Sequence, residues 1–304
     1  MKLFSAPMQG HTDAAFRHFH ASFYGEADAY FTPFVRIERG DFRQRDLRDL
    51  RSDLNENHYL IPQIIFNSVE EFDRLVQVIV ESGHRSIDLN IGCPFPMQTN
   101  HGRGASVIAN VELFNAISAR IKENPDLSFS LKMRPGLKNN DEWEKIIDTI
   151  NDTPLAHVTF HPRVATQKYA GDIDFAAFED FLKVCAHPVV YNGDITTPAQ
   201  ITELMDKYPS LIGIMVGRGL LARPSLFNES LSSEWQRDKR LDTMLRFHNA
   251  LKDHYAQRLC GESQLIEKMK TFWEFAEPEI GRKIWKAIKK ATSMAKYDSA
   301  VSMI

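Results

Sequence analysis

One cysteine lies on a short turn where a thiol can take part in chemistry. Cys93 stands in the run Asp88-Leu89-Asn90-Ile91-Gly92-Cys93-Pro94, between a glycine and a proline. A free thiol has a pKa of about 8.5, so it is mostly protonated at neutral pH. Cys93 is therefore a candidate catalytic acid or nucleophile. The alternative is a small buried hydrophobic residue, which describes Cys185 better.

Two turns that contain glycine are candidates for binding a phosphate group. They read Asn192-Gly193-Asp194 and Gly217-Arg218-Gly219, and each follows an apolar run. Glycine lets the backbone approach a ligand closely, and the fork of donors on Arg218 can grip a phosphate. We expect a phosphorylated cofactor here, with two ordinary turns as the alternative.

Three further polar side chains accompany apolar runs. Lys132 alternates with apolar neighbours in Ser130-Leu131-Lys132-Met133-Arg134, and a buried lysine is costly unless an anion pairs with it. His161 and Arg163 follow Val158-Thr159-Phe160, where a histidine can donate to a phosphate or to a substrate carbonyl. Lys132 is thus a candidate partner of an anionic cofactor. A surface lysine and a histidine satisfied in the core are the alternatives.

Short apolar runs are expected to form the strands that position these side chains. Eight are found: Leu3–Met8, Ala29–Phe34, Leu60–Phe66, Ser86–Asn90, Phe129–Met133, His157–His161, Pro188–Asn192 and Leu211–Gly217. Most are separated by segments with helical spacing, at 69–80 after the candidate N-cap Ser68, at 113–121 and at 142–150. This alternation predicts a (β/α)₈ TIM barrel. An open doubly wound sheet is the rival, but the first turn has no G-x-G-x-x-G.

A barrel would bring the polar residues together, because barrel enzymes build their sites at the C-terminal ends of the strands. The first run ends in Pro7-Met8-Gln9, the third contains Gln63, and the fourth leads to Asn90 and Cys93. The loops after strands seven and eight, which carry Gly193 and Gly217, are where barrels often bind phosphate. The sequence therefore predicts one site made from many strand ends.

Residues 235–304 have helical spacing only, interrupted at Gly261 and Gly281. We expect a catalytic barrel over 1–234 and a small helical domain over 235–304. The helical segment holds 14 Lys and Arg against nine Asp and Glu, although the chain as a whole has a formal net charge of −3. A basic segment on an acidic body suggests an anionic partner, with a solvated helix face as the alternative. Its expected last helix carries Arg282, Lys283, Lys286, Lys289, Lys290 and Lys296.

The three cysteines form no C-x-x-C pair, so neither a disulfide framework nor a metal site is expected. The N-terminus lacks the apolar stretch of a signal peptide, and no run of about 18 apolar residues exists. We expect a cytoplasmic protein, and a monomer by default.

Several motifs together resemble the tRNA-dihydrouridine synthase family over nearly the whole chain. They are Ala6-Pro7-Met8-Gln9-Gly10-His11-Thr12-Asp13-Ala14-Ala15-Phe16-Arg17, the Cys93 run followed by Gly102-Arg103-Gly104-Ala105, His161-Pro162-Arg163 with Gln167-Lys168-Tyr169-Ala170-Gly171, Tyr191-Asn192-Gly193-Asp194-Ile195, and Met215-Val216-Gly217-Arg218-Gly219. The resemblance implies an FMN-binding barrel followed by a helical RNA-binding domain. It also implies NADPH as electron donor and uridine in tRNA as substrate.

By position, the resemblance assigns a role to each matching residue. Pro7, Met8 and Gln63 would contact the flavin ring, and Lys132 would lie near its N1/O2 edge. The ribityl phosphate end would be held by His161, Asn192, Gly193, Asp194, Gly217 and Arg218. Asn90 would face the uracil, Arg163 would lie in the substrate segment, and Cys93 would donate a proton to C5 while hydride adds at C6. The base must leave its stack, and the basic helices would grip RNA phosphates.

The chain departs from the family pattern at two places. A lysine usually follows the Cys-Pro pair, but this chain has Pro94-Phe95-Pro96-Met97, and Pro162 replaces a usual glycine. Two other functions stay open: a flavin barrel that reduces a small pyrimidine, which would not need the basic helices, and a non-catalytic RNA-binding protein.

Overall fold

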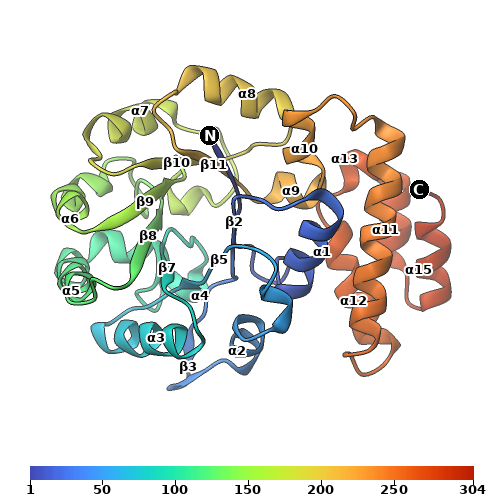
Figure 1. The fold of residues 1–304 in the computed structure, drawn as a ribbon, viewed down its shortest axis with the longest axis horizontal. Coiled ribbons are helices and arrows are strands. Elements are labelled where there is room, and N and C mark those ends of the chain that lie inside the picture. Colours follow the sequence, from blue (N-terminus) through green and yellow to red (C-terminus); the bar gives the residue numbers. More distant parts are fainter.

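Nine short strands form one parallel sheet that curls into a nearly closed barrel (Figure 1). The computed structural model describes residues 1–304. In hydrogen-bonded order the strands are β5 (Leu60–Ile61), β2 (Ala29–Phe31), β1 (Lys2–Ser5), β11 (Gly213–Val216), β10 (Val189–Asn192), β9 (Leu155–Phe160), β8 (Ser128–Met133), β7 (Ser86–Ile91) and β6 (Gln63–Ile64).

The barrel closes at a proline. β5 and β6, at the two ends of the hydrogen-bonded order, are consecutive in the chain and separated only by Pro62, which has no N–H to donate to a ladder. Both lie within the expected strand at 60–66, so the eight predicted strands account for all nine. All pairings within this nine-stranded sheet are parallel, and apart from β1 with β11 they join barrel strands that are successive in the chain, which confirms the (β/α)₈ barrel and rules out the doubly wound sheet.

Helices surround the barrel between successive strands (Figure 1). They are α1 (Ala14–Tyr24), α2 (Gln44–Leu50), α3 (Val69–Glu81), α5 (Val111–Lys122), α6 (Ile147–Asp152), α7 (Phe175–Val184), α8 (Pro198–Lys207), α9 (Arg218–Ala222) and α10 (Leu226–Leu231). The predicted N-cap of α3 is confirmed, because the Ser68 hydroxyl accepts from the N–H of Glu71 at 3.2 Å. A small hairpin, β3 (Ile37–Glu38) and β4 (Asp41–Phe42), precedes α2.

The helix expected over 142–150 is divided into a 3₁₀ turn at Glu142–Lys145 and the later α6. The carboxylate of Glu142 accepts from the backbone N–H groups of Leu137, Lys138 and Asn139, at 2.8 to 3.0 Å. The start of this segment is therefore tied to the preceding loop, which apolar spacing alone does not indicate.

Successive side chains along each strand point to opposite faces of the sheet, so they pack into two different cores. Leu3 on β1 belongs to the large cluster of buried residues that continues into the surrounding helices. The next residue, Phe4, packs with Phe31, Val190 and Met215 in a smaller cluster. Phe4 is in register with Met215 on one side and Ala29 on the other, so this smaller cluster fills the barrel interior below the strand ends.

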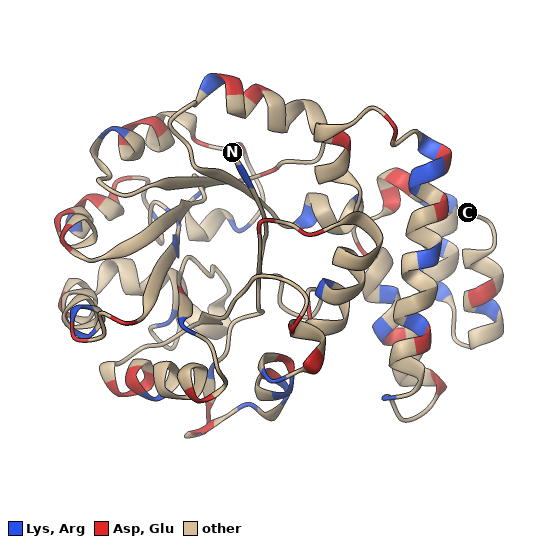
Figure 2. Cartoon of the chain, viewed as in Figure 1, with Lys and Arg blue, Asp and Glu red and all other residues tan.

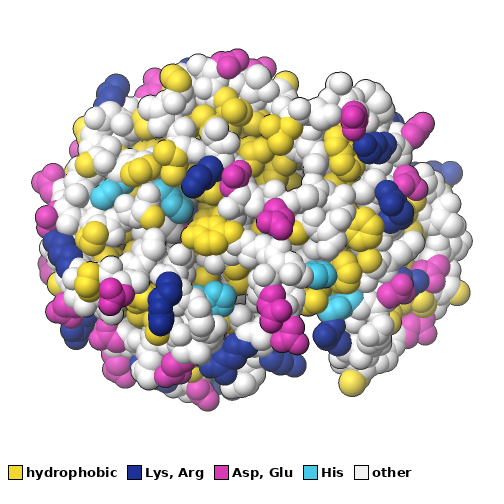
Figure 3. All heavy atoms as spheres, in the orientation of Figure 1, with side chains coloured by type: hydrophobic (Ala, Val, Ile, Leu, Met, Phe, Trp, Pro, Cys, Tyr) yellow, Lys and Arg dark blue, Asp and Glu magenta, His cyan; other side chains and the backbone are white.

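The C-terminal region is helical, as predicted. It comprises α11 (Arg237–Ala256), α12 (Glu262–Trp273), α13 (Glu277–Ile280), α14 (Arg282–Lys290) and α15 (Met294–Val301). Gly261 and Gly281, at φ +88° and +85°, break the helices where expected. In Figure 3 a notch at the edge of the molecule marks where this region meets the barrel. None of the helices combines the length and apolar character needed to cross a membrane.

The expected last helix is in fact two helices. Arg282 to Lys290 lie on α14, whereas Lys296 lies on α15 after a break at 291–293. The Ser293 hydroxyl accepts from the N–H of Lys296 and starts the new helix. The helical region also shares a core with α1, since Phe16 packs against Phe247 at 5.3 Å between ring centroids. The predicted boundary at residue 234 falls between α10 and α11, and the division into two domains stays a prediction.

Candidate active site

A cavity of about 1000 Å³ opens at the C-terminal ends of the strands. Its walls come from the loops after β1, β7, β8, β9, β10 and β11, and from Glu274, Phe275 and Pro278 near α13. Eleven of the residues predicted from sequence line it: Pro7, Met8, Asn90, Cys93, Lys132, His161, Asn192, Gly193, Asp194, Gly217 and Arg218. The rule that barrel sites form at strand ends therefore predicted where this cavity lies.

Cys93 is held at one wall of the cavity by backbone contacts. Its N–H donates to Oδ1 of Asn90 at 2.8 Å, and its carbonyl accepts from the N–H of Ala105 at 3.1 Å. Gly104 lies so close that an added Cβ would come within 2.8 Å of the Cys93 Cβ. Cys93 is 8% exposed, and burial raises the pKa of its thiol above that of a free cysteine, although the N–H of Phe95 opposes part of this shift. Cys93 therefore carries a proton at neutral pH.

A chain of buried hydrogen bonds orients Asn90. Its Nδ2 donates to Oε1 of Gln63 at 2.8 Å, and Nε2 of Gln63 donates to Asp88 at 2.6 Å. The Ser130 hydroxyl donates to the other Asp88 oxygen at 2.7 Å. Burial raises the pKa of Asp88 to about 6. Because Oδ1 of Asn90 accepts from both Gly92 and Cys93, this chain fixes the turn that presents the thiol.

Gln63 was expected to contact a cofactor ring, but the structure places it beneath the cavity wall. It is fully buried between Asp88 and Asn90 and does not line the cavity. The contact it makes is with Asn90, so its direct contact with a cofactor stays a prediction.

Lys132 projects from β8 into the cavity. Its Nζ donates to Oδ1 of Asn192 at 2.8 Å, and Nδ2 of Asn192 donates to the carbonyl of Met215 at 2.7 Å. No carboxylate lies within salt-bridge distance of Lys132, so burial, reinforced by the charge of Arg134, lowers its pKa to about 8. An anion in the cavity would offset this and hold the ammonium charged.

His161 and two glycines form another part of the cavity wall. His161 is 6% exposed, and its Nε2 is buried without a hydrogen-bond partner. Burial, together with the charges of Arg134, Lys132, Arg163 and Arg218, holds its pKa well below 6.5, so the ring is neutral. A Cβ at Gly217 would lie 3.1 Å from Sδ of Met8, and one at Gly193 would lie 2.8 Å from Ile173. Larger residues would therefore fill this part of the cavity.

Arg163 was expected to bind substrate, and this role stays a prediction. Its side chain is fully buried and outside the cavity, where it donates to both oxygens of Asp194, at 3.2 and 2.5 Å, and to the carbonyl of Gly171 at 2.6 Å. Burial alone would raise the pKa of Asp194, but these hydrogen bonds and the charges of Arg163 and Arg218 hold it below its ordinary value. Arg163 thus positions Asp194, which in turn accepts from Arg218 at 2.6 Å.

Several lining residues were not predicted as site residues. Arg134 is buried and donates to the carbonyls of Arg163, Val164 and Lys168, so it holds the 163–168 loop. Tyr169 also lines the cavity, and the guanidinium of Arg218 lies over its ring at 4.3 Å from the centroid. The others include Arg36, Phe95, Met97 and Phe275. Arg134 ends the same run as Lys132, a signal that could have identified it.

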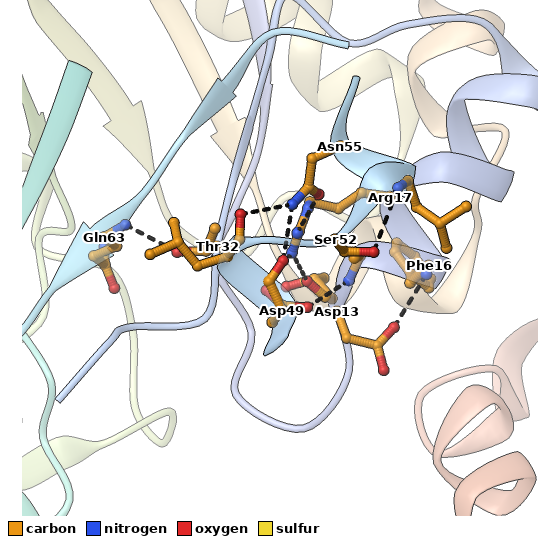
Figure 4. A network of polar contacts seen from close by, with 12 residues as sticks. Asp13, Phe16, Arg17, Thr32, Asp49, Ser52, Asn55 and Gln63 are labelled. Atoms are coloured by element: carbon orange, nitrogen blue, oxygen red, sulfur yellow. Dashed lines mark hydrogen bonds and ion pairs between the residues drawn. The ribbon is translucent and has the colours of Figure 1, made fainter. Parts of the chain in front are cut away.

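The loop after β1 is anchored by a polar network that the sequence motif did not explain (Figure 4). Arg17 is fully buried and donates to Asp49 at 3.0 Å, to Asn55 at 2.7 Å and to the carbonyl of Thr12 at 2.7 Å. The carboxylate of Asp13 caps α1. It also accepts a hydrogen bond from the hydroxyl of Tyr255 on α11 at 2.7 Å and forms a salt bridge with Lys268 on α12 at 2.8 Å. The motif that leads from Pro7 and Met8 is therefore tied to the C-terminal helices.

No group of three or more His, Cys, Asp or Glu side chains is arranged to hold a metal ion, and Cys93, Cys185 and Cys260 are free thiols. The cationic side chains that line the cavity are those of Arg36, Lys132, Arg134 and Arg218.

Solved structures with the same fold include the old yellow enzyme from Trypanosoma cruzi, with a TM-score of 0.55, 10% sequence identity, and coverage of 77% of this chain and 89% of that one. Morphinone reductase aligns with a TM-score of 0.54 and 11% identity, over 75% of this chain and 84% of that chain. At these identities the likeness concerns the barrel fold.

Sequence relatives agree over most of the chain. A probable tRNA-dihydrouridine synthase 2 of Bacillus subtilis is 28% identical over 265 residues, which cover 83% of this chain and 78% of the relative. A probable tRNA-dihydrouridine synthase of Treponema pallidum is 27% identical over 303 residues, 93% of this chain and 86% of the relative. The model of the dihydrouridine synthase (Dus) family matches residues 4–294. The chain is a member of the dihydrouridine synthase family.

Proposed function

We propose that this protein reduces the C5=C6 bond of specific uridines in tRNA to give dihydrouridine, with FMN as its cofactor and NADPH as the electron donor. Family membership and the names of the relatives support the reaction and the tRNA substrate. The observation that carries the proposal is a protonated, buried thiol in the wall of a cavity that is also lined by cationic side chains and by glycines.

The residues present fit an FMN molecule. A phosphate is complementary to the unpartnered Nε2 of His161, the guanidinium of Arg218 and the close backbone approach at Gly193 and Gly217. Lys132 would supply the charge for the anionic ring system, with Pro7, Met8 and Asn192 around it. When bound, FMN supplies the hydride that adds to C6 of uracil.

Cys93 completes the reduction. As negative charge develops from C5 toward O4, the thiol of Cys93 donates its proton to C5, so that one hydride and one proton saturate the double bond. Asn90 holds the Cys93 turn through Oδ1, and its second Nδ2 proton is available for a uracil carbonyl. Arg163 supports the phosphate end through Asp194.

The basic face of α14 is proposed to bind RNA. Arg282, Lys283, Lys286, Lys289 and Lys290 are exposed and form no salt bridge, and neither does Lys296 on α15. Several other cations of this region are neutralised, for example Lys252 by Asp298 and Arg240 by Glu279. Figure 2 shows the basic residues of the molecule interspersed with acidic ones. Free charges are those that gain most from phosphate.

We further propose that residues 1–234 are the FMN-binding domain and 235–304 the RNA-binding domain. The reaction is expected in the cytoplasm, where tRNA is modified, and in a monomer.

The test combines purified protein, FMN, NADPH and tRNA from a strain that lacks the gene, with dihydrouridine counted by mass spectrometry. Wild-type protein should form dihydrouridine in tRNA, and Cys93→Ala should bind FMN and accept electrons from NADPH while product formation falls by orders of magnitude. Cys185→Ala is the matched control. Reduction of free uridine but not of tRNA would contradict the RNA substrate, and full activity of Cys93→Ala would remove the proposed acid.

A further inference from the structure

An exposed aromatic ring stands at the mouth of the cavity, two residues after Cys93. Phe95 is 45% exposed and Met97 is 69% exposed, whereas Cys93 is 8% exposed. All three line the cavity. Exposed apolar side chains that lie together at the rim of a cavity are typical of a surface that contacts a ligand. These two therefore require an explanation that the reduction itself does not give.

The backbone presents Phe95 rigidly. Pro94 and Pro96 flank it, and its carbonyl accepts from the N–H groups of Gln98 at 2.8 Å and Thr99 at 3.0 Å. Proline fixes its own φ and restricts the residue before it to extended conformations, as found at Phe95, with φ −75° and ψ 133°. The backbone that carries the ring is thus fixed before any ligand arrives, which reduces the conformational entropy lost on binding.

The surroundings select the kind of ligand. Tyr169 is the nearest ring, at 6.3 Å between centroids and tilted by 55°, and Arg218 lies over Tyr169 at 4.3 Å. Arg36, Arg134 and Lys132 also line the cavity. Lys132 and Arg218 are assigned to the cofactor, so the feature that points to a nucleobase is the open aromatic ring itself. Proteins bind single-stranded nucleic acid by stacking its bases on such rings.

We infer that Phe95 stacks on the nucleobase next to the uridine that is reduced. This inference rests on the proposed function. The reacting base must pass into the cavity to reach Cys93, and a base that leaves its stack deprives its neighbour of a stacking partner. Phe95, at the mouth, replaces that partner, and Met97 extends the apolar surface. The neighbouring base, rather than the target base, is thus the ligand of this ring.

The test uses Phe95→Leu, Phe95→Tyr and tRNA transcripts in which the nucleotide on one side of the mapped uridine is abasic. Phe95→Leu should weaken binding of intact tRNA by between about fivefold and 150-fold, the range for loss of one base–aromatic stack. It should raise KM and leave kcat at saturating tRNA nearly unchanged. Phe95→Tyr should restore affinity, because it keeps the ring. Phe175→Leu, a change at a 39% exposed ring outside the cavity, is the matched control.

The decisive comparison is between the two perturbations. If Phe95 stacks on the neighbouring base, one abasic transcript binds wild-type protein as weakly as intact tRNA binds Phe95→Leu, and combining the two adds no further loss. Three results would each overturn the inference. The first is that the losses of affinity from Phe95→Leu and from the abasic site add for both transcripts. The others are that Phe95→Leu binds tRNA with wild-type affinity, or that NADPH reduces the flavin of this variant more slowly. If wild-type protein forms no dihydrouridine in tRNA, the proposed function fails instead. The two failures are distinguishable, because the affinity of the oxidised protein for tRNA is measured without the reaction.

Discussion

Gly104→Ala should slow the protonation step while flavin binding and flavin reduction stay unchanged. The residue lies at φ +59°, and an added Cβ would come within 2.7 Å of the Cys93 carbonyl oxygen and 2.8 Å of the Cys93 Cβ. Non-bonded carbon atoms prefer separations of about 3.5–4.0 Å. The Cys93 turn must therefore retreat by about 0.7–1 Å, and a misplacement of about 1 Å costs on the order of 10²-fold in rate.

Gly102→Ala is the control for backbone strain. Gly102 lies in the same loop at φ +71°, but its added Cβ would meet only the Cβ of Asn67, at 3.7 Å. Both variants should lose about 1–2 kcal/mol of stability from the left-handed conformation. Only Gly104→Ala should also displace the thiol.

The assay is a single turnover of reduced protein with excess tRNA, followed by quantification of dihydrouridine. Gly104→Ala should be about 10²-fold slower than Gly102→Ala, while NADPH reduces the flavin of both at the wild-type rate. Thermal unfolding monitors the shared strain. Equal product rates in the two variants would refute the claim that contact with Gly104 sets the position of Cys93.

Three other outcomes follow from the structure. Cys93 acts in its protonated form, and burial raises its pKa above 9.0. The single-turnover rate should therefore stay constant through neutral pH and fall only as pH rises past 9. A fall centred near pH 7 would assign the step to another group. Arg163→Met should destabilise the fold by about 1–3 kcal/mol in denaturant unfolding, because it removes the hydrogen bonds from a fully buried guanidinium to Asp194 and to the carbonyl of Gly171. Arg218→Met should cost less than about 1 kcal/mol, and equal losses would contradict this ranking. Replacing Lys283, Lys286, Lys289 and Lys290 by glutamine should reduce the slope of log affinity for tRNA against log salt by up to about 3, and an unchanged slope would place the RNA elsewhere.

The fold was largely predictable because its signals are local and repeated. Each apolar run is short and bounded by polar loops, and eight of them in alternation with helical spacing specify a barrel. Details that depend on single backbone groups were not predictable in this way. Pro62 interrupts one strand, and Ser293 starts a separate helix before Lys296, so the expected last helix became α14 and α15.

The site was predictable where a residue follows directly from its strand, as for Lys132 on β8 and His161 after β9. It was less predictable where a distant partner captures the side chain. Arg163 turns away from the cavity because Asp194, 31 residues later, accepts both of its terminal nitrogens. The contribution of Phe275 depends on how the C-terminal helices dock, which spacing within one helix does not reveal.

The shared core between α1 and the C-terminal helices limits how the chain can be divided. Phe16 and Tyr24 of α1 belong to the same buried cluster as Phe247 and Trp273, and Asp13 is anchored by Tyr255 and Lys268. A fragment that ends at residue 234 would expose this face and release the anchor of the loop that carries Met8. Transplanting the helical region onto another barrel would consequently require α1 and its preceding loop as well, so the unit that evolution or an engineer can exchange is discontinuous in sequence.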